Sequence, residues 1–208
     1  MISLLIDTCT NNVVIGLFSD TKVIDQRIEV NDKTLSTNFV VWVQELLDRN
    51  NLQVKDIDTI YVAVGPGSFT GIRVGVTFAK VFAWALGKRV VPFSSLELLA
   101  TSSDHEVIVP LIDARRGYVF AGIYDNNLNA LMDDKYILMP QLLENINKYD
   151  KPVFVSLDEF GVGEIKPNVN IEKLLIKHIN DAGVNPHSLN PNYLKQTEAE
   201  ENLLVKND

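Results

Sequence analysis

Short apolar runs alternate along this chain with longer stretches in which apolar residues recur every three or four positions. The short runs predict strands at residues 3–6, 13–18, 22–29, 59–64, 90–93, 107–112, 118–124, 135–139 and 152–156. The longer stretches predict helices at residues 34–49 and 71–86. Shorter helices are predicted after Ser94, with Glu97 completing a capping box, at 141–147, and at 171–180 between an Asn170 cap and Gly183. This order indicates a mixed α/β protein.

The helix predicted at residues 34–49 has an unusually wide apolar surface. One face is formed by Leu35, Phe39, Trp42 and Leu46, and Val40, Val41, Val43 and Leu47 widen it. A helix that only lies on a sheet needs an apolar stripe about 100° wide. The helix is therefore either enclosed within its own chain or covered on a second side by another chain.

The helix predicted at residues 71–86 carries a stripe of small residues, Gly71, Gly75, Ala79 and Ala83, spaced four apart. Glycine inside a helix costs roughly 1 kcal/mol relative to alanine, so another element should lie unusually close. The stripe packs either on the protein's own sheet or helix, or on a partner chain as well. Larger residues on the other sides suit a core: Ile72, Val76, Val81, Phe82 and Leu86.

A glycine-rich turn joins the strand at 59–64 to this helix, and its residues are Gly65, Pro66, Gly67, Ser68, Phe69 and Thr70. A strand, a glycine turn and a helix can hold an anion or let another backbone approach closely. A Walker loop would need Lys and Ser or Thr after its last glycine, whereas Ile72 and Arg73 follow Gly71. The spacing of Gly67 and Gly71 also breaks the dinucleotide pattern. A tight turn without a ligand is the plain alternative.

The second half of the chain repeats the first. Leu5-Ile6-Asp7 and Leu111-Ile112-Asp113 are identical at an offset of 106, and the same offset matches Val13 with Val119 and Gly16 with Gly122. Chance agreement between two hairpins is the alternative. A duplicated β-β-β-α-β-α unit is typical of the two-lobed architecture of actin, sugar kinases and heat-shock ATPases (ASKHA). We expect lobes at residues 1–103 and 104–190, and a tail at 191–208 that packs back on the first lobe.

In that superfamily an Asp at the end of the first strand, followed by glycine, lies near nucleotide phosphates. Here Cys9 stands where such a glycine would allow close approach, and its side chain would crowd a phosphate. We therefore expect Asp7 to cap a turn rather than to act in catalysis.

Composition is that of an ordinary globular protein, with 46% hydrophobic and 22% charged residues among 208. No run of 18 apolar residues occurs and the N-terminus resembles a strand, so neither a membrane span nor a signal peptide is expected. The single cysteine, Cys9, fits a cytoplasmic protein. A formal net charge of −8 argues against unaided binding of a nucleic-acid backbone.

Groups needed for stand-alone chemistry are scarce. The three histidines, His105, His178 and His187, are not spaced to ligate a metal from one helical face, so no metal site is expected. His178 is expected on the surface or half-buried. Ser68 is the one suggestive nucleophile for a peptidase, but no histidine base lies near it in sequence. Arg115 and Arg116, in a tight turn, are either solvated or able to bind a phosphate or a partner's carboxylate.

The chain resembles the TsaB (YeaZ) family of tRNA threonylcarbamoyladenosine (t6A) biosynthesis proteins. The resemblance rests on four segments in the family's order: Leu5-Ile6-Asp7-Thr8; Gly65-Pro66-Gly67-Ser68-Phe69-Thr70-Gly71-Ile72-Arg73-Val74-Gly75; Ile112-Asp113-Ala114-Arg115-Arg116-Gly117; and Pro191-Asn192-Tyr193-Leu194-Lys195. The second is highly specific and the others are supportive.

The resemblance implies a catalytically silent cytoplasmic subunit without a catalytic cofactor. Such a subunit forms a heterodimer with its paralogue TsaD, the threonylcarbamoyl transferase, or a homodimer when alone. TsaE, a small ATPase, joins the complex, tRNA is contacted only indirectly, and ATP or ADP could lie at the subunit boundary. The interface it implies is built from the two long helices, by Leu35, Phe39, Trp42, Val43, Leu46, Gly71, Arg73, Gly75, Ala79 and Ala83.

Two departures limit the resemblance, since Lys33-Thr34 replaces a usual His-Ser pair and Lys195 replaces a usual Arg. A role for that His-Ser pair is therefore not carried over. Alternative functions are an ATP-dependent enzyme of the ASKHA superfamily acting alone and, less favoured, a peptidase. If the interface is correct, Gly75→Arg should abolish TsaD binding and leave the fold soluble.

Overall fold

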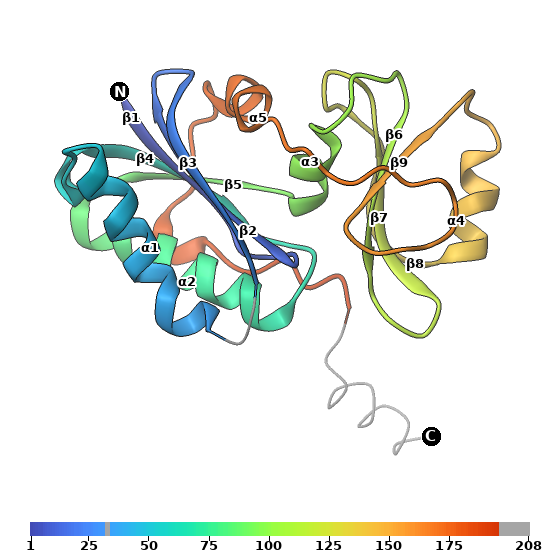
Figure 1. Cartoon of the computed structure of the whole chain (residues 1–208), viewed down its shortest axis with the longest axis horizontal. Coiled ribbons are helices and arrows are strands. Elements are labelled where there is room, and N and C mark those ends of the chain that lie inside the picture. Colours follow the sequence, from blue (N-terminus) through green and yellow to red (C-terminus); the bar gives the residue numbers. More distant parts are fainter. Residues whose placement is uncertain (32–33, 196–208) are drawn as a thin grey trace, which may run out of the picture.

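In a computed structural model of the chain, residues 1–31 and 34–195 are described, and they form two lobes, each built on one sheet (Figure 1). The first sheet has the order β3-β2-β1-β4-β5. Its strands are β1 (Ile2–Asp7), β2 (Asn12–Ser19), β3 (Lys22–Val30), β4 (Ile57–Ala63) and β5 (Arg89–Phe93). The first three strands are antiparallel neighbours, and β4 and β5 continue the sheet in parallel from β1.

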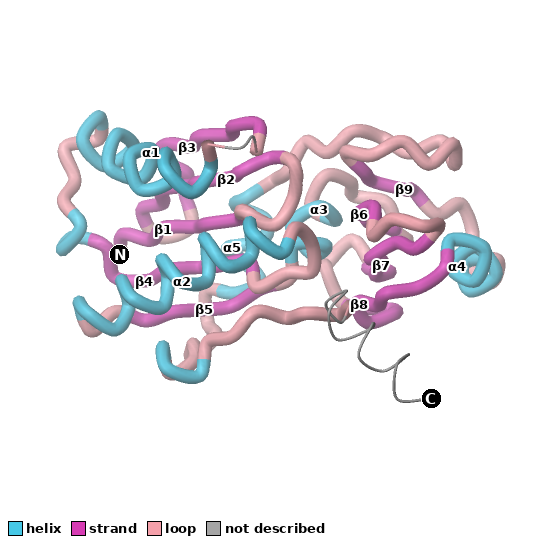
Figure 2. Tube along the Cα trace, turned by 90° about the horizontal axis from the view of Figure 1, so that it is seen from below, coloured by secondary structure: helices cyan, strands magenta, loops and turns pink. Residues whose placement is uncertain are grey.

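Helices cover both faces of the first sheet. On one face lie α1 (Leu35–Arg49) and α2 (Phe69–Leu86), side by side across the strands, as Figure 2 shows. The opposite face carries α5 (Ile171–His178), and a β-carbon on Gly16 of β2 would lie 2.8 Å from the Ile171 side chain. Short 3₁₀ turns occur at Val54–Asp56 and Pro186–Ser188.

The second sheet has the order β8-β7-β6-β9 and repeats the strand arrangement of the first four strands. Its elements are β6 (Ile108–Asp113), β7 (Tyr118–Tyr124), β8 (Ala130–Leu138), β9 (Val153–Ser156) and α4 (Met139–Ile146), which covers its outer face (Figure 1). The predicted duplication and the two-lobed ASKHA fold are therefore present.

The residue-by-residue correspondence between the halves is less regular than the sequence offset predicts. Asp7 pairs with Val14 in the first hairpin, whereas Asp113 pairs with Val119 in the second, so the second turn is one residue shorter. A single unbroken offset therefore cannot describe both strands. The turn chemistry is nevertheless repeated, because each aspartate accepts a hydrogen bond from the amide two residues later, that of Cys9 or Arg115.

The expected boundary of the second lobe at residue 190 differs from the structure. Helix α5 belongs to the first lobe, since Ile171, Leu174 and Leu175 lie in the same core as β1 and β2. The reason is the apolar face of α5, which covers the otherwise open side of the first sheet. Further along, the amide of Asn192 donates to the carbonyl of Val64 at 2.7 Å, so residues 191–195 return to the first lobe. Residues 196–208 lie outside the described part.

Helix α3 (Ser95–Ala100) lies between the two sheets, and its cap is only half the predicted box. Ser94 accepts from the amide of Leu96, but the Glu97 carboxylate instead contacts Lys177 at 2.8 Å and His178 at 3.0 Å on α5. Burial acts to raise the pKa of Glu97, but His178 and Lys177 outweigh burial and hold that pKa below its ordinary value.

Of the two positions predicted for His178, on the surface or half-buried, the structure shows the second, with 13% of its side chain exposed. Burial acts to lower its pKa, but Glu97 and Asp181 raise it above the ordinary histidine value. The Asn170 cap is also confirmed, since its side chain accepts from the amide of Lys173. Gly183 does not end the helix, because α5 ends at His178 with Ile179 as its cap.

Candidate functional site

The small-residue stripe of α2 packs on the chain's own first sheet, and its two glycines lie against the end of the first strand. A β-carbon on Gly71 would lie 1.9 Å from the carbonyl oxygen of Thr8, and one on Gly75 would lie 2.5 Å from the Thr8 hydroxyl. Ala79 and Ala83 are buried on the same face. The glycines thus let α2 approach β1 closely. The first of the two alternatives for the stripe, packing on the protein's own sheet, is therefore correct. By length and hydropathy α2 is also the one helix in the described part that could span a membrane, but this inner face is packed on the sheet.

The glycine turn before α2 is locked onto the turn between β1 and β2. The amide of Ser68 donates to the carbonyl of Cys9 at 2.7 Å, and a β-carbon on Gly67 would lie 2.1 Å from that oxygen. Gly67 has φ of 149°, a conformation that side chains rarely adopt. The Ser68 hydroxyl caps α2 by accepting from the amide of Gly71 at 3.3 Å. Close backbone approach, rather than an open phosphate loop, is therefore what this turn provides.

Asp7 caps the β1–β2 turn, as predicted. Its carboxylate accepts from the amide of Cys9 at 2.7 Å and is 2% exposed. Burial raises the pKa of Asp7 to about 6. The predicted crowding by the Cys9 side chain takes a different form, because the thiol is buried toward the carbonyl of Ala63. It is the Cys9 carbonyl that fills the space at the glycine turn.

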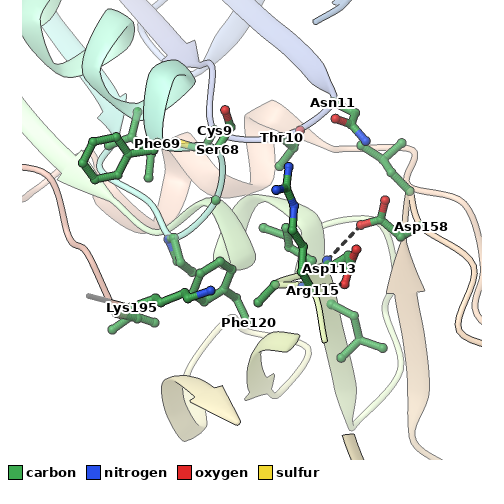
Figure 3. Close-up of a pocket in the computed structure, with 18 of the residues that line it drawn as sticks. Cys9, Thr10, Asn11, Ser68, Phe69, Asp113, Arg115, Phe120, Asp158 and Lys195 are labelled. Atoms are coloured by element: carbon green, nitrogen blue, oxygen red, sulfur yellow. Dashed lines mark hydrogen bonds between the residues drawn. The ribbon is translucent and has the colours of Figure 1, made fainter. Parts of the chain in front are cut away.

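A cleft of about 720 Å³ lies between the lobes (Figure 3). The first lobe contributes the β1–β2 turn and the glycine turn, the second lobe contributes the ends of β6 and β9, and residues 192–195 form one edge. Polar groups in the lining are Thr10, Asn11, Ser68, Thr70, Asp113, Arg115, Asp158, Asn192 and Lys195. Apolar walls come from Ile72, Leu99, Phe120, Leu157 and Leu194, among others.

Of the two predicted arginines, Arg115 lines the cleft and Arg116 does not. None of the histidines lines the cleft either, so among the described residues Ser68 has no histidine base beside it. His178 is paired with Glu97, and His187 contacts the Trp84 ring. Within residues 1–31 and 34–195 there is also no cluster of three His, Cys, Asp or Glu that could hold a metal ion.

A second cavity, a groove of about 680 Å³, runs between α1 and α2 on the outer surface. We define the helix groove by its lining residues: Ser36, Phe39, Val40, Thr70, Arg73, Val74, Thr77, Phe78, Val81 and Phe82. Its floor is aromatic, since the Phe78 ring lies 5.2 Å from that of Phe39 and 5.3 Å from that of Phe82. At its rim Val40 and Val81 are more than half exposed.

The residues predicted to form a partner interface are mostly enclosed by the chain itself. Eight are buried: Leu35, Phe39, Val43, Leu46, Gly71, Gly75, Ala79 and Ala83. Trp42 is half-buried with the Arg27 guanidinium over its ring, and Arg73 is exposed. The exposed surface of the two helices is therefore provided mainly by other residues, among them Val40 and Val41, which widen the predicted apolar face of α1, and Val81, which was predicted in a core.

Val81 and Leu86 show why the exposed surface of α2 was not identified from the sequence. They were expected in a core because they are large and apolar, yet they are 55% and 40% exposed. Helix α2 turns its glycines and alanines inward, because close approach to the sheet requires small residues there, and larger apolar residues remain outside. The regular four-residue spacing of the small residues was the signal that could have identified the inward face.

Comparison with known proteins agrees with this architecture. The family model described as TsaD, tRNA N6-adenosine threonylcarbamoyltransferase, matches residues 23–161. The tRNA threonylcarbamoyladenosine biosynthesis protein TsaB of Bacillus subtilis is 32% identical over 96% of each chain. The chain belongs to the TsaB family. Within the family, TsaB of Escherichia coli is 26% identical over 67% of this chain and 63% of its own.

A solved structure supports the same fold. YeaZ from Pseudomonas aeruginosa superposes with a TM-score of 0.75 and 21% identity, covering 93% of this TsaB-family chain and 99% of its own.

Proposed function

We propose that this chain is a non-catalytic subunit of the t6A synthesis complex and that it binds and activates a TsaD transferase through the helix groove. The observation that carries the proposal is an apolar, aromatic-floored groove on the outside of α1 and α2 in a member of the TsaB family. Exposed, contiguous apolar surface of this kind marks protein-binding sites in globular proteins.

The rim of the helix groove adds to this interpretation. Val40 and Val81 are 59% and 55% exposed, and Trp84 on the next turn of α2 is 63% exposed. Arg73 is the charged group in the lining, and its guanidinium lies 3.9 Å from the centre of the Phe69 ring. Aromatic residues and arginine are enriched in the centres of protein interfaces.

A stand-alone ATP-dependent enzyme is less well supported. The two turns that would cradle a phosphate are packed on each other through the amide of Ser68 and the carbonyl of Cys9. Asp7 is withdrawn from solvent and bonded to the amide of Cys9. This arrangement favours a scaffold over a phosphoryl-transfer site.

The remaining parts of the proposal follow from the family. TsaE joins the complex, tRNA is reached through the partner because this chain carries a net charge of −8, and the chain forms a homodimer when TsaD is absent. We place the protein in the cytoplasm. ATP or ADP at the boundary between the subunits stays a prediction. Lys33, which replaces the usual His of the His-Ser pair, lies outside the described residues.

The test uses Val81→Asp, which puts a charge into the helix groove without touching the core. We expect affinity for TsaD, measured by calorimetry, to fall about tenfold or more, and t6A formation by the mixed subunits to fall with it. Ile176→Asp on α5 is the matched control, since Ile176 is 58% exposed on the opposite face of the sheet, and it should bind normally.

Unchanged affinity of Val81→Asp for TsaD would exclude the helix groove as the interface. Gly75→Arg, the variant suggested by the sequence, is unsuitable, because even a β-carbon there would lie 2.5 Å from the Thr8 hydroxyl. It would damage the fold rather than leave it soluble.

A further inference from the structure

We propose that the cleft between the lobes binds a small molecule in which one phosphate or carboxylate group is attached to a planar or apolar body, and that Arg115 recognises the anionic group. This site lies between the lobes, adjoins the helix groove only at Thr70, and goes beyond partner binding. Its volume of about 720 Å³ lies in the range of small-molecule sites, which run from about 300 to 1,000 Å³.

The position of Arg115 is the main argument. In Figure 3 its side chain extends from the second lobe across the cleft toward Thr10 of the first lobe. Among residues 1–31 and 34–195 its guanidinium has no hydrogen-bond or ion-pair partner. A guanidinium offers five N–H donors in a fork that matches phosphate and carboxylate, and here that fork faces a cavity.

The turn that carries Arg115 is built in a costly conformation. Arg115 and Arg116 both have positive φ, 67° and 57°, and Gly117 follows at 79°. Such a conformation costs about 1 kcal/mol or more at a residue other than glycine and is concentrated at functional sites. Asp113 and Asp158 hold the turn by accepting from the amides of Arg115 and Asp113, both at 2.9 Å. The turn held in this way carries Arg115 into the lining of the cleft.

Other groups in the lining complete a site for a charged head and a less polar body. Lys195, whose ammonium lies 5.5 Å from the centre of the Tyr136 ring, supplies a second cation at the edge formed by the tail. Asp113 and Asp158 each keep one carboxylate oxygen free of the hydrogen bonds named above, so they can accept from hydroxyl or amino groups of a ligand. The apolar wall includes Phe120, Leu99 and Leu157, which suit a ring.

The glycine turn does not bind the anionic group in this site. Its Ser68 amide is already donated to Cys9, and the Cys9 amide is donated to Asp7. The anionic group is therefore assigned to the second lobe, at Arg115, with the Ser68 and Thr70 hydroxyls on the opposite wall.

The experiment titrates the full chain with AMP, benzoate and adenosine by calorimetry. AMP carries a phosphate on a planar body, benzoate carries a carboxylate, and adenosine lacks the anion. We expect AMP or benzoate to bind. Adenosine should bind at least about tenfold more weakly than the anion that binds. The substitution Arg115→Gln should lower the affinity for that anion about tenfold or more. Arg116→Gln is the matched control, from the same turn but outside the lining, and should bind within about twofold of wild type.

Binding of AMP alone identifies the anion as a phosphate, and binding of benzoate alone identifies it as a carboxylate. The proposal is overturned if neither binds at about 10 mM, if adenosine binds as well as AMP, or if Arg115→Gln binds like wild type while its thermal unfolding is unchanged. Because Arg115 is not in the helix groove, TsaD binding by Arg115→Gln should stay normal, which separates this test from that of the proposed function.

Discussion

The hydroxyl of Thr8 donates a hydrogen bond of 2.6 Å to the carbonyl oxygen of Gly71. This contact joins the end of β1 to the first turn of α2, where the carbonyl of Thr8 also lies directly against Gly71. The hydroxyl and the carbonyl of Thr8 therefore both contact Gly71 and fix the strand to the helix. The glycine turn directly precedes this junction, and Thr70, next to Gly71, lines both the cleft and the helix groove.

Substitution of the two buried glycines of α2 should destabilise the protein by different amounts. In Gly71→Ala the new methyl group meets a backbone oxygen at 1.9 Å, so main chain has to move, and we expect a loss of about 3 kcal/mol or more. In Gly75→Ala it meets the Thr8 hydroxyl at 2.5 Å, a side-chain atom, and we expect about 1–2 kcal/mol. Urea denaturation measures both.

Thr77→Ala, at an exposed position of the same helix, is the control and should change the free energy of unfolding by less than about 0.5 kcal/mol. Equal stability of Gly71→Ala and wild type would show that α2 does not approach β1 this closely.

Asp7 should make stability depend on pH between about pH 4 and 6. Burial raises the pKa of Asp7 from 3.8 to about 6 in the folded protein, so the folded state binds the proton more tightly than the unfolded state. The stabilisation is complete below about pH 4 and is lost as the pH rises through 6. A shift of this size corresponds to about 3 kcal/mol.

Asp7→Asn keeps the oxygen that accepts from Cys9 and removes the titration. The stability of Asp7→Asn relative to wild type should therefore rise by about 2–3 kcal/mol between pH 4 and pH 7.5, as measured by urea denaturation. A difference that stays constant over this range would contradict the burial of an ionisable Asp7.

Much of the fold could be read from the sequence because local patterns control it. The strands of both sheets and helices α1 and α2 follow from apolar periodicity, and the second hairpin was found through its likeness to the first. The capping roles of Asp7 and Asn170 also follow from local chemistry, since each side chain bonds an amide two or three residues away.

What depends on distant contacts could not be read in the same way. Glu97 looked like a capping residue, but α5, some eighty positions later, brings Lys177 and His178 to it. Some outward-facing apolar residues of α2 were predicted in the core. Apolarity alone does not indicate that a helix packs on a sheet through its glycines. Arg115 was noticed, but its place in a cleft required the relative position of the two lobes.

The tail should be held to α2 by Tyr193. Its ring stacks on that of Phe69 at 4.6 Å, and its hydroxyl accepts from Nε of Arg73 at 2.9 Å. Tyr193→Phe removes only the hydrogen bond and Tyr193→Ala removes the stack as well. We expect losses of about 0.5 and about 1.5 kcal/mol in the free energy of unfolding.

Arg73 also lines the helix groove. Tyr193→Ala releases the Arg73 side chain and should therefore alter the affinity for TsaD. Tyr193→Phe keeps the aromatic ring that confines Arg73. If both variants unfold like wild type, residues 191–195 are not anchored at this position.

The isolated chain should not hydrolyse ATP. A phosphoryl-transfer site needs open backbone donors for the phosphates, and here the amides of Ser68 and Cys9 are both donated within the protein, to the Cys9 carbonyl and the Asp7 carboxylate. Phosphate release from ATP and magnesium should therefore equal the background without protein. The opposite result would be phosphate release above the background that disappears in both Asp7→Asn and Ser68→Ala while these variants remain folded. It would show that the β1–β2 turn opens to admit a nucleotide and that the chain is an enzyme in its own right.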